Sequence, residues 1–268
     1  MIKICENYAF NHDIRFNGKK SQLLVFGGLP DQQIDIRVND EPVPVSDNAL
    51  HLGNFISTKN VYECIDYGVT KFNSSFNYFM ATFGKCQKLV KNRLFTQYCM
   101  TLYGSQVWPL WDNNRLNNLC IKWRIALRRM WNLPPDTHCN LLPLITSQDP
   151  INIQLKCRFL KFYKSLIKSD NDIVCFLARK MTSTYRSTMS KNLREIMYDL
   201  NLDYGEIMTI SANKVKQLYY NMWLAGVDEQ SMVNAKVIHD LNLMKDHIYV
   251  DDFDSYECDL IIRYLCTV

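Results

Sequence analysis

Glycine and proline are scarce in this sequence, and long apolar runs are missing from it. Only 9 glycines and 8 prolines occur among 268 residues, too few for a collagen-like or low-complexity chain. No run approaches the length and apolarity of a membrane-spanning helix. The first residues, MIKICENYAFNHD, lack a basic start followed by an apolar stretch, so we expect no signal peptide, no membrane partner and a nuclear or cytoplasmic location. Apolar residues make up 47% of the chain, which is enough for an ordinary folded core.

Closely spaced metal ligands are also missing, although the chain contains 10 cysteines. No two cysteines form a CxxC pair, and the 5 histidines do not cluster near them. Because structural zinc sites need ligands at short, paired spacings, we expect no metal site. The cysteines are expected to be reduced thiols, most of them buried. The sequence also has no glycine-rich phosphate loop and no serine flanked by the glycines of a nucleophile elbow.

The net charge of +4 conceals a strong asymmetry along the chain. Residues 1–70 carry 6 basic and 9 acidic side chains, and residues 195–268 carry 5 basic and 13 acidic ones. Residues 71–194 carry 20 basic and only 5 acidic side chains, a net charge of +15. Because solvated helix surfaces usually mix both signs, this block predicts a surface that meets a polyanion.

Short apolar segments predict only small elements in the first part of the chain. Residues 2–10 can form a short amphipathic helix, and the apolar run QLLVF at 22–26 predicts a buried strand. Alternating residues around Asn39-Asp40 predict a hairpin over 34–45, and a short strand or a tight hairpin is expected around Gly53. These elements are too few to fold alone, and their strand edges require a sheet to join.

From about Tyr62 onward, apolar residues recur at spacings of three and four, which predicts amphipathic helices. Shorter helices are expected at 172–182, 190–200 and 212–225, and the polar stretch 181–190 is the best candidate for a linker. The first four helices have these predicted apolar stripes: Ile65, Val69, Phe72, Phe76, Phe79 and Phe83; Leu89, Leu94, Tyr98 and Leu102; Leu116, Leu119, Cys120, Trp123, Leu127 and Met130; Leu155, Phe159, Phe162, Leu166 and Ile167.

Four segments, in order, carry a resemblance to a known family. Residues 13–28 (DIRFNGKKSQLLVFGG) place Asn17 and then Lys20-Ser21 before an apolar strand, and residues 50–57 read LHLGNFIS. LYGSQVW at 102–108 and LRRMWNLPPDTHCNLL at 127–142 follow. In order and separation these segments are similar to the region beyond the catalytic centre of non-LTR (LINE-type) retrotransposon reverse transcriptases. The resemblance covers residues 5–165 approximately.

The resemblance implies a division of labour. In this family the aspartates that bind the divalent ions, Mg²⁺ in an intact polymerase, lie upstream of the Asn-x-x-Lys-Ser segment. This chain alone is therefore expected not to polymerise and to carry no cofactor. Lys20 corresponds to a lysine near the incoming triphosphate, a candidate general acid in an intact enzyme. His51, Leu52 and Gly53 correspond to the primer grip, with His51 where the family has tyrosine. The helical block corresponds to the thumb, which tracks the backbone of the duplex.

Cationic side chains off the predicted apolar stripes agree with a thumb that contacts phosphates. They gather at the start of the second helix, on the third, and on the fourth, where no acidic residue occurs between Pro150 and Ser169. We expect them to bind RNA or an RNA–DNA hybrid without sequence preference, and the missing upstream part of the polymerase is a further expected partner. The predicted nucleic-acid-binding residues are Asn17, Lys20, Lys88, Lys91, Arg93, Lys122, Arg124, Arg128, Arg129, Lys161 and Lys164.

The tetrapeptide Tyr249-Val250-Asp251-Asp252 spells the metal-binding signature of reverse transcriptases, but in the wrong place. In the family this signature precedes the Asn-x-x-Lys-Ser segment, whereas here it follows that segment far along the chain. A polar, acidic stretch (FDSYECD) comes after it instead of an apolar strand. We expect an exposed acidic loop there and no metal site.

These observations predict an α+β chain that is mostly α. Residues 1–58 would be an incomplete palm edge, residues 59–182 a helical, basic, thumb-like region, and residues 183–268 an acidic helical tail of unassigned role. The predicted function is that of a reverse-transcriptase fragment that retains at most nucleic-acid binding. Two alternatives stay open: a domesticated protein-interaction module, and a truncated copy without function.

Overall fold

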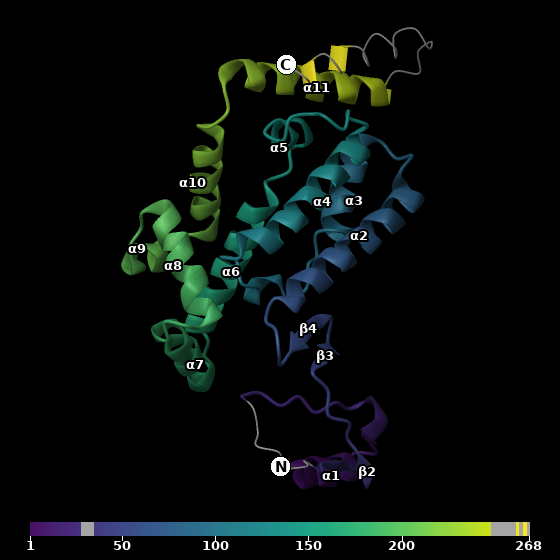
Figure 1. Cartoon of the computed structure of the whole chain (residues 1–268), viewed down its shortest axis with the longest axis vertical. Helices are drawn as coiled ribbons and strands as arrows, with labels where there is room; N and C mark the ends of the chain where they lie inside the picture. The colour runs from purple at the N-terminus through teal and green to yellow at the C-terminus, as the bar shows by residue number, and fades with distance from the viewer. Residues whose placement is uncertain (28–34, 248–260, 263–264, 267–268) are drawn as a thin grey trace. The chain divides into compact units, whose positions relative to one another are not determined.

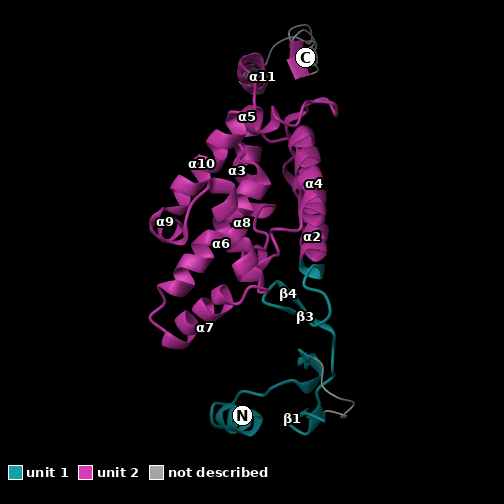
Figure 2. Ribbon diagram, turned by 60° about the vertical axis from the view of Figure 1, so that its left-hand side comes forward, with its two compact units in different colours: residues 1–64 teal, residues 65–268 magenta. Residues whose placement is uncertain are grey.

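The computed structural model of the chain describes residues 1–27, 35–247, 261–262 and 265–266. In these residues the protein is mostly helical, with two small antiparallel sheets of two strands each. The predicted α+β, mostly α class is therefore confirmed. The chain forms two compact units, Met1–Cys64 and Ile65–Val268 (Figure 2). The tetrapeptide at 249–252 lies outside the described residues.

The first unit contains a helix, a 3-10 turn and two hairpins, which confirms the hairpin predicted over 34–45 and, around Gly53, the hairpin rather than the single strand. Each hairpin turn holds two residues in the left-handed region: φ is 51° and 61° at Asn39 and Asp40, and 49° and 80° at Leu52 and Gly53. Two-residue hairpins favour this conformation because its twist matches that of the strands. The elements are α1 (Ile2–Asn11), η1 (Gly18–Lys20), β1 (Arg37–Val38), β2 (Glu41–Pro42), β3 (Asn48–His51) and β4 (Asn54–Ser57) (Figure 1).

The buried strand expected at 22–26 is wrong. Only Leu23 pairs there, in an isolated parallel bridge with Val45, and Phe26 is exposed. An apolar strand is stable only against a sheet that covers it, and no such sheet is present among the described residues of this unit. Of those residues, only Ala9 and Gly18 are buried. This agrees with the expectation that residues 1–58 are too few to build a core.

The second unit is built from helices packed around α6. This helix contacts η2, α4, α7, α8 and α10, and it lies between α4 and α8 in Figure 1. None of the described helices combines the length and apolarity needed to cross a bilayer. The elements are α2 (Glu63–Phe83), α3 (Lys88–Tyr98), η2 (Ser105–Val107), α4 (Asn113–Trp131), α5 (Leu142–Thr146), α6 (Ile151–Ile167), α7 (Asp172–Ser183), α8 (Thr188–Leu200), α9 (Tyr204–Thr209), α10 (Ala212–Leu224) and α11 (Glu229–His247).

The apolar stripes of α2 and α4 form the core largely as predicted. Phe72, Phe76 and Phe79 of α2 surround Phe95 of α3, with ring centroids 6.1 Å apart in each pair with Phe95. On α4 the predicted residues are buried except Cys120, which is partly exposed. On α6 the prediction holds for Leu155 and Phe159, whereas Phe162, Leu166 and Ile167 are only half-buried. The three-to-four spacing thus identified most of the core.

The predicted stripe of the second helix is wrong at two of its four residues, although the helix itself is present. Leu89 and Tyr98 are exposed, and the buried positions of α3 are Lys88, Lys91 and Phe95. These three positions also follow a helical spacing. The long hydrocarbon stem of a lysine can pack like an apolar side chain. The face with Phe95 packs against the phenylalanines of α2. Lys88 and Lys91 lie on the same face and are therefore buried with it, although they are charged.

The stretch at 181–190 is a short helix connection and not a linker. α7 continues to Ser183, α8 begins at Thr188, and both Met189 and Ser190 are buried. Asn192 of α8 is fully buried and joins α8 to the loop that contains Trp108. Residues 59–182 and 183–268 were predicted as separate regions, but helices from both sides of this boundary pack into one unit.

Candidate nucleic-acid interface

Two helices that contain no carboxylate side chain carry 9 of the 20 basic residues of the basic block. Neither α4 nor α6 includes an Asp or Glu, and the two helices contact each other. Asp112 begins α4 by accepting a hydrogen bond from the Arg115 amide at 3.1 Å. Asn132, in the left-handed region at φ 54°, ends it. The cations of these helices fall into three groups according to what they bind.

One group holds backbone carbonyls and is structural. Arg128 donates from Nε and Nη2 to the carbonyl of Thr137, at 3.1 and 2.6 Å. Arg158 donates to the carbonyls of Met100 and Thr101, and Lys164 donates to that of Ile210. Burial lowers the pKa of both Arg158 and Lys164. These cations fix loops to the helices, so Arg128 and Lys164 are poorly placed to contact phosphates.

A second group is neutralised by carboxylates. Arg115 pairs with Asp66 and Asp112. Lys156 pairs with Glu195, at 3.1 Å, and with Asp199. These ion pairs reduce the positive charge at the start of each helix.

Lys156 belongs to a half-buried network that the sequence analysis missed. Its partner Asp199 also accepts a hydrogen bond from the Tyr219 hydroxyl at 2.9 Å. Burial raises the pKa of Tyr219, and the neighbouring Asp199 adds to the shift. Glu195 and Asp199 are four residues apart on α8 and therefore share a face. The sequence shows this acidic pair, but nothing near it in the chain indicates that Lys156 is its partner.

The third group has no ion pair among the described residues: Lys122, Arg124, Arg129 and Lys161. Arg129 is exposed, lies 5.2 Å from the ring centroid of Phe76 and donates to Asn77 Oδ1 at 3.4 Å. Its partners belong to α2, whereas Arg124 faces a groove beside α6. The helix α4 therefore presents cations on two different sides: Arg129 toward α2 and Arg124 toward α6. We call Lys122, Arg124, Arg129 and Lys161 the unpaired cations.

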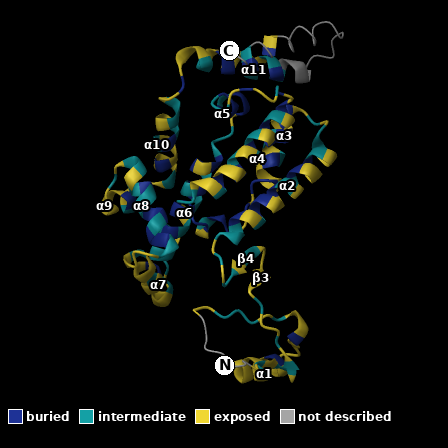
Figure 3. Cartoon of the chain, viewed as in Figure 1, coloured by how far each residue is buried: buried dark blue, intermediate teal, exposed yellow. Residues whose placement is uncertain are grey.

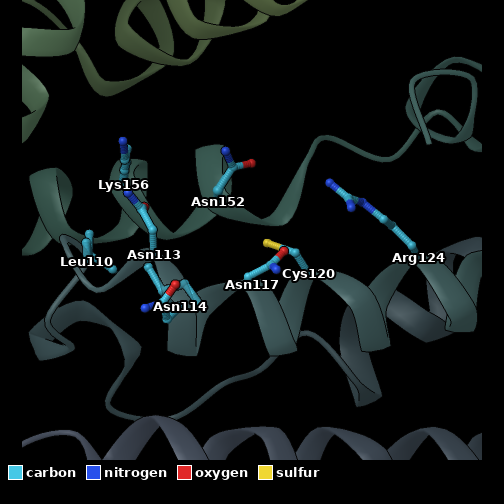
Figure 4. Close-up of a pocket in the computed structure, with 9 residues that line it drawn as sticks. Leu110, Asn113, Asn114, Asn117, Cys120, Arg124, Asn152 and Lys156 are labelled. Atoms are coloured by element: carbon cyan, nitrogen blue, oxygen red, sulfur yellow. The ribbon is translucent and has the colours of Figure 1, made fainter.

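The groove between α4 and α6 has a volume of about 360 Å³. Figure 4 shows Asn117 and Arg124 projecting from α4 below it, and Asn152 and Lys156 on α6 above it. Carboxamides both donate and accept hydrogen bonds, and a guanidinium matches the geometry of a phosphate. The groove can therefore accept a sugar-phosphate backbone. Its lining residues are Leu110, Asn113, Asn114, Leu116, Asn117, Cys120, Arg124, Asn152 and Lys156.

The lysines predicted at the start of the second helix lie inside the unit. Lys88 and Lys91 are 5% and 4% exposed. Lys88 Nζ donates to the carbonyl of Asn242 at 2.8 Å, and Lys91 Nζ donates to that of Gly84 at 3.4 Å. Arg93 is exposed. The structure thus brings together only part of the predicted basic surface.

In the first unit, the predicted residues lie on exposed turns. The Asn17 side chain accepts from the Lys20 amide at 3.1 Å and so caps η1, while the Lys20 side chain is exposed. His51, Leu52 and Gly53 are exposed at the turn between β3 and β4.

Alkaline pH is expected to destabilise the helical unit through two buried thiols. Burial raises the pKa of Cys99 from 9.0 to about 12 and that of Cys157 to about 11. Because the folded state holds these protons more tightly, their contribution to stability is complete below pH 9 and declines as the pH rises toward 11 and 12. Urea denaturation should show a loss of ~2 kcal/mol between pH 8 and pH 10. In a Cys99→Val variant this loss should be smaller by ~1 kcal/mol; an unchanged pH dependence would contradict the assignment.

No group of three or more His, Cys, Asp or Glu side chains in the described part of the chain could hold a metal ion. No family model, no curated protein and no solved structure matches the chain.

Proposed function

We propose that this chain is the part of a non-LTR retrotransposon reverse transcriptase that follows the catalytic aspartates, and that it binds RNA or an RNA–DNA duplex without catalysis. The observation that carries the proposal is the pair of packed helices, α4 and α6, which have no carboxylate and expose unpaired cations. The order of the Asn-x-x-Lys-Ser, Leu-Gly and later helical segments in the sequence supports the family.

Binding in this proposal depends on phosphates and not on bases. The unpaired cations lie on helices whose backbone is already ordered, so contact with a phosphate backbone orders only their side chains. Arg124 and the asparagines of the groove add directional hydrogen bonds to phosphate or ribose oxygens. A thumb needs this kind of contact because it must follow a duplex of any sequence.

Lys20 and the turn formed by His51, Leu52 and Gly53 act in this proposal only when the rest of the palm is present. The metal-binding aspartates of the family would come from that upstream part, and the Mg²⁺ with them. The chain alone is then a binding module. The exposed apolar residues of the first unit, such as Phe26 and Leu52, would be covered by the missing palm sheet.

A salt titration of binding to a labelled RNA–DNA hybrid tests the proposal. The variant replaces the four unpaired cations, Lys122, Arg124, Arg129 and Lys161, with alanine. Its affinity should fall ~10–100-fold at ~0.1 M salt, and the slope of log K against log salt should become shallower by ~3. Arg128 is left unchanged because its loss would release the Thr137 loop.

The matched control replaces four exposed cations outside α4 and α6 with alanine, and so removes the same charge: Arg179, Arg186, Lys214 and Lys236. This control should lose less than ~3-fold in affinity. Equal losses in the two variants would mean that net charge alone is responsible. If the folded wild-type protein shows no binding at low salt, the proposal is wrong and an interaction module or an inactive copy is left.

A further inference from the structure

The helix α7 buries almost none of its apolar side chains. Only Ala178 is buried, and Figure 3 shows most of α7 in the colour of exposed residues. Ile173, Phe176, Leu177 and Met181 are 69%, 64%, 52% and 44% exposed. Their spacing of three and four places them on one face of the helix. A contiguous exposed apolar face of this kind marks an interaction surface.

The two ends of α7 carry charges of opposite sign. Asp170 precedes α7, and Asp172 is its first residue. Arg179 and Lys180 lie near its end, and Arg186 follows it. Asp172, Phe176 and Lys180 are four residues apart in sequence, so they form one row along the exposed surface. The two charged residues of this row are separated by about 12 Å along the axis and cannot reach each other. Neither is ion paired among the described residues.

We propose that α7 is the contact surface of a symmetric dimer of this chain. In a twofold dimer the same surface meets itself, and a twofold axis perpendicular to α7 makes its two copies run antiparallel. With the axis beside Phe176, Asp172 of each copy lies opposite Lys180 of the other. The apolar face is buried in the same contact. A parallel arrangement would instead place like charges side by side.

The positions of Asp172 and Lys180 at opposite ends of the row indicate that the partner is a second copy of this chain. A surface made for an acidic or a basic partner would carry one sign, whereas the row on α7 is complementary to itself once it is reversed. One helix of 12 residues provides a small interface, which suits a weak dimer rather than an obligate one. This inference goes beyond the proposed nucleic-acid binding and does not depend on it.

Sedimentation equilibrium of the full chain between ~5 and ~500 µM tests the dimer, since a weak contact populates with concentration. The wild-type mass should rise from 31.5 kDa toward twice that value. Phe176→Glu should stay at the monomer mass throughout. The control Tyr198→Glu, at a residue that is 88% exposed on α8, should behave as the wild type. Circular dichroism should show equal helix content in all variants, because each replaced side chain is exposed.

Charge reversal separates this dimer from any other apolar contact. Lys180→Asp places two carboxylates opposite each other, so it should weaken dimerisation ~10-fold. Adding Asp172→Lys reverses the row and restores its complementarity, so the double variant should return to within ~3-fold of the wild type. A wild type that stays monomeric, a dimer that survives Phe176→Glu, or a double variant that remains weak would each overturn the proposal.

Discussion

Replacing Asn192 with leucine is expected to lower the free energy of unfolding of the helical unit by ~3 kcal/mol. The Asn192 side chain is fully buried. Its Oδ1 accepts from the Leu110 amide and its Nδ2 donates to the Trp108 carbonyl, both at 2.8 Å. Leucine has a similar size but leaves both backbone groups buried without a partner, and such groups retain their full cost of desolvation.

Urea denaturation followed by circular dichroism measures this effect. The control is Asn118→Leu, at an exposed position of α4, which should change stability by less than ~0.5 kcal/mol. Asn192→Asp keeps an acceptor for Leu110 but cannot donate to Trp108 and also buries a charge, so it should be destabilising as well. A loss of less than ~1 kcal/mol in Asn192→Leu would show that Asn192 does not hold the loop.

Replacing Gly68 with alanine is expected to destabilise the same unit by ~2 kcal/mol, although alanine is the better helix former. A Cβ atom at this position of α2 would lie 2.3 Å from Cη2 and 2.4 Å from Cζ2 of Trp108. Trp108 is itself buried. Close-packed interiors have no room for such a contact, so the indole or the helix must move.

A double-mutant cycle identifies the cause. Phenylalanine at position 108 lacks the outer indole atoms, so Gly68→Ala should cost at least ~1 kcal/mol less in a Trp108→Phe background. Gly226→Ala serves as the control, because its Cβ would meet no atom closer than 3.4 Å. If the two changes at Gly68 and Trp108 are simply additive, the clash is not the source of the loss.

Helix positions and hairpin turns could be predicted because local patterns determine them. The spacing of Phe72, Phe76 and Phe79 fixes one buried face whatever packs against it. Asn39-Asp40 adopts left-handed angles readily, so the hairpin at that turn follows from two residues. The helix α9 was missed even though Asp203 and Glu206 form a capping box, a signal that the sequence does contain. The helix α5 was also missed, and α11, like α9, was covered only by the general expectation of a helical tail at 183–268.

The candidate interface could be predicted only as a charge block. The sequence shows that α4 and α6 lack carboxylates, but it does not show what each cation binds. Arg128 is held by the Thr137 carbonyl and Lys156 by carboxylates of α8. Thr137 lies in a loop 9 residues from Arg128, and Asp199 lies 43 residues from Lys156, so no helical spacing reveals either partner. The groove asparagines were missed for the same reason, since they become neighbours only when the two helices pack.

By itself, then, the sequence determined the mostly helical class, the two hairpins and the concentration of positive charge. These properties depend on residues close together in the chain. The tertiary structure alone decided that Lys88 and Lys91 are buried, that residues 22–26 form no strand, and which cations stay unpaired. Burial and pairing depend on which faces meet, and that choice is made by the packing of the whole unit rather than by any single segment.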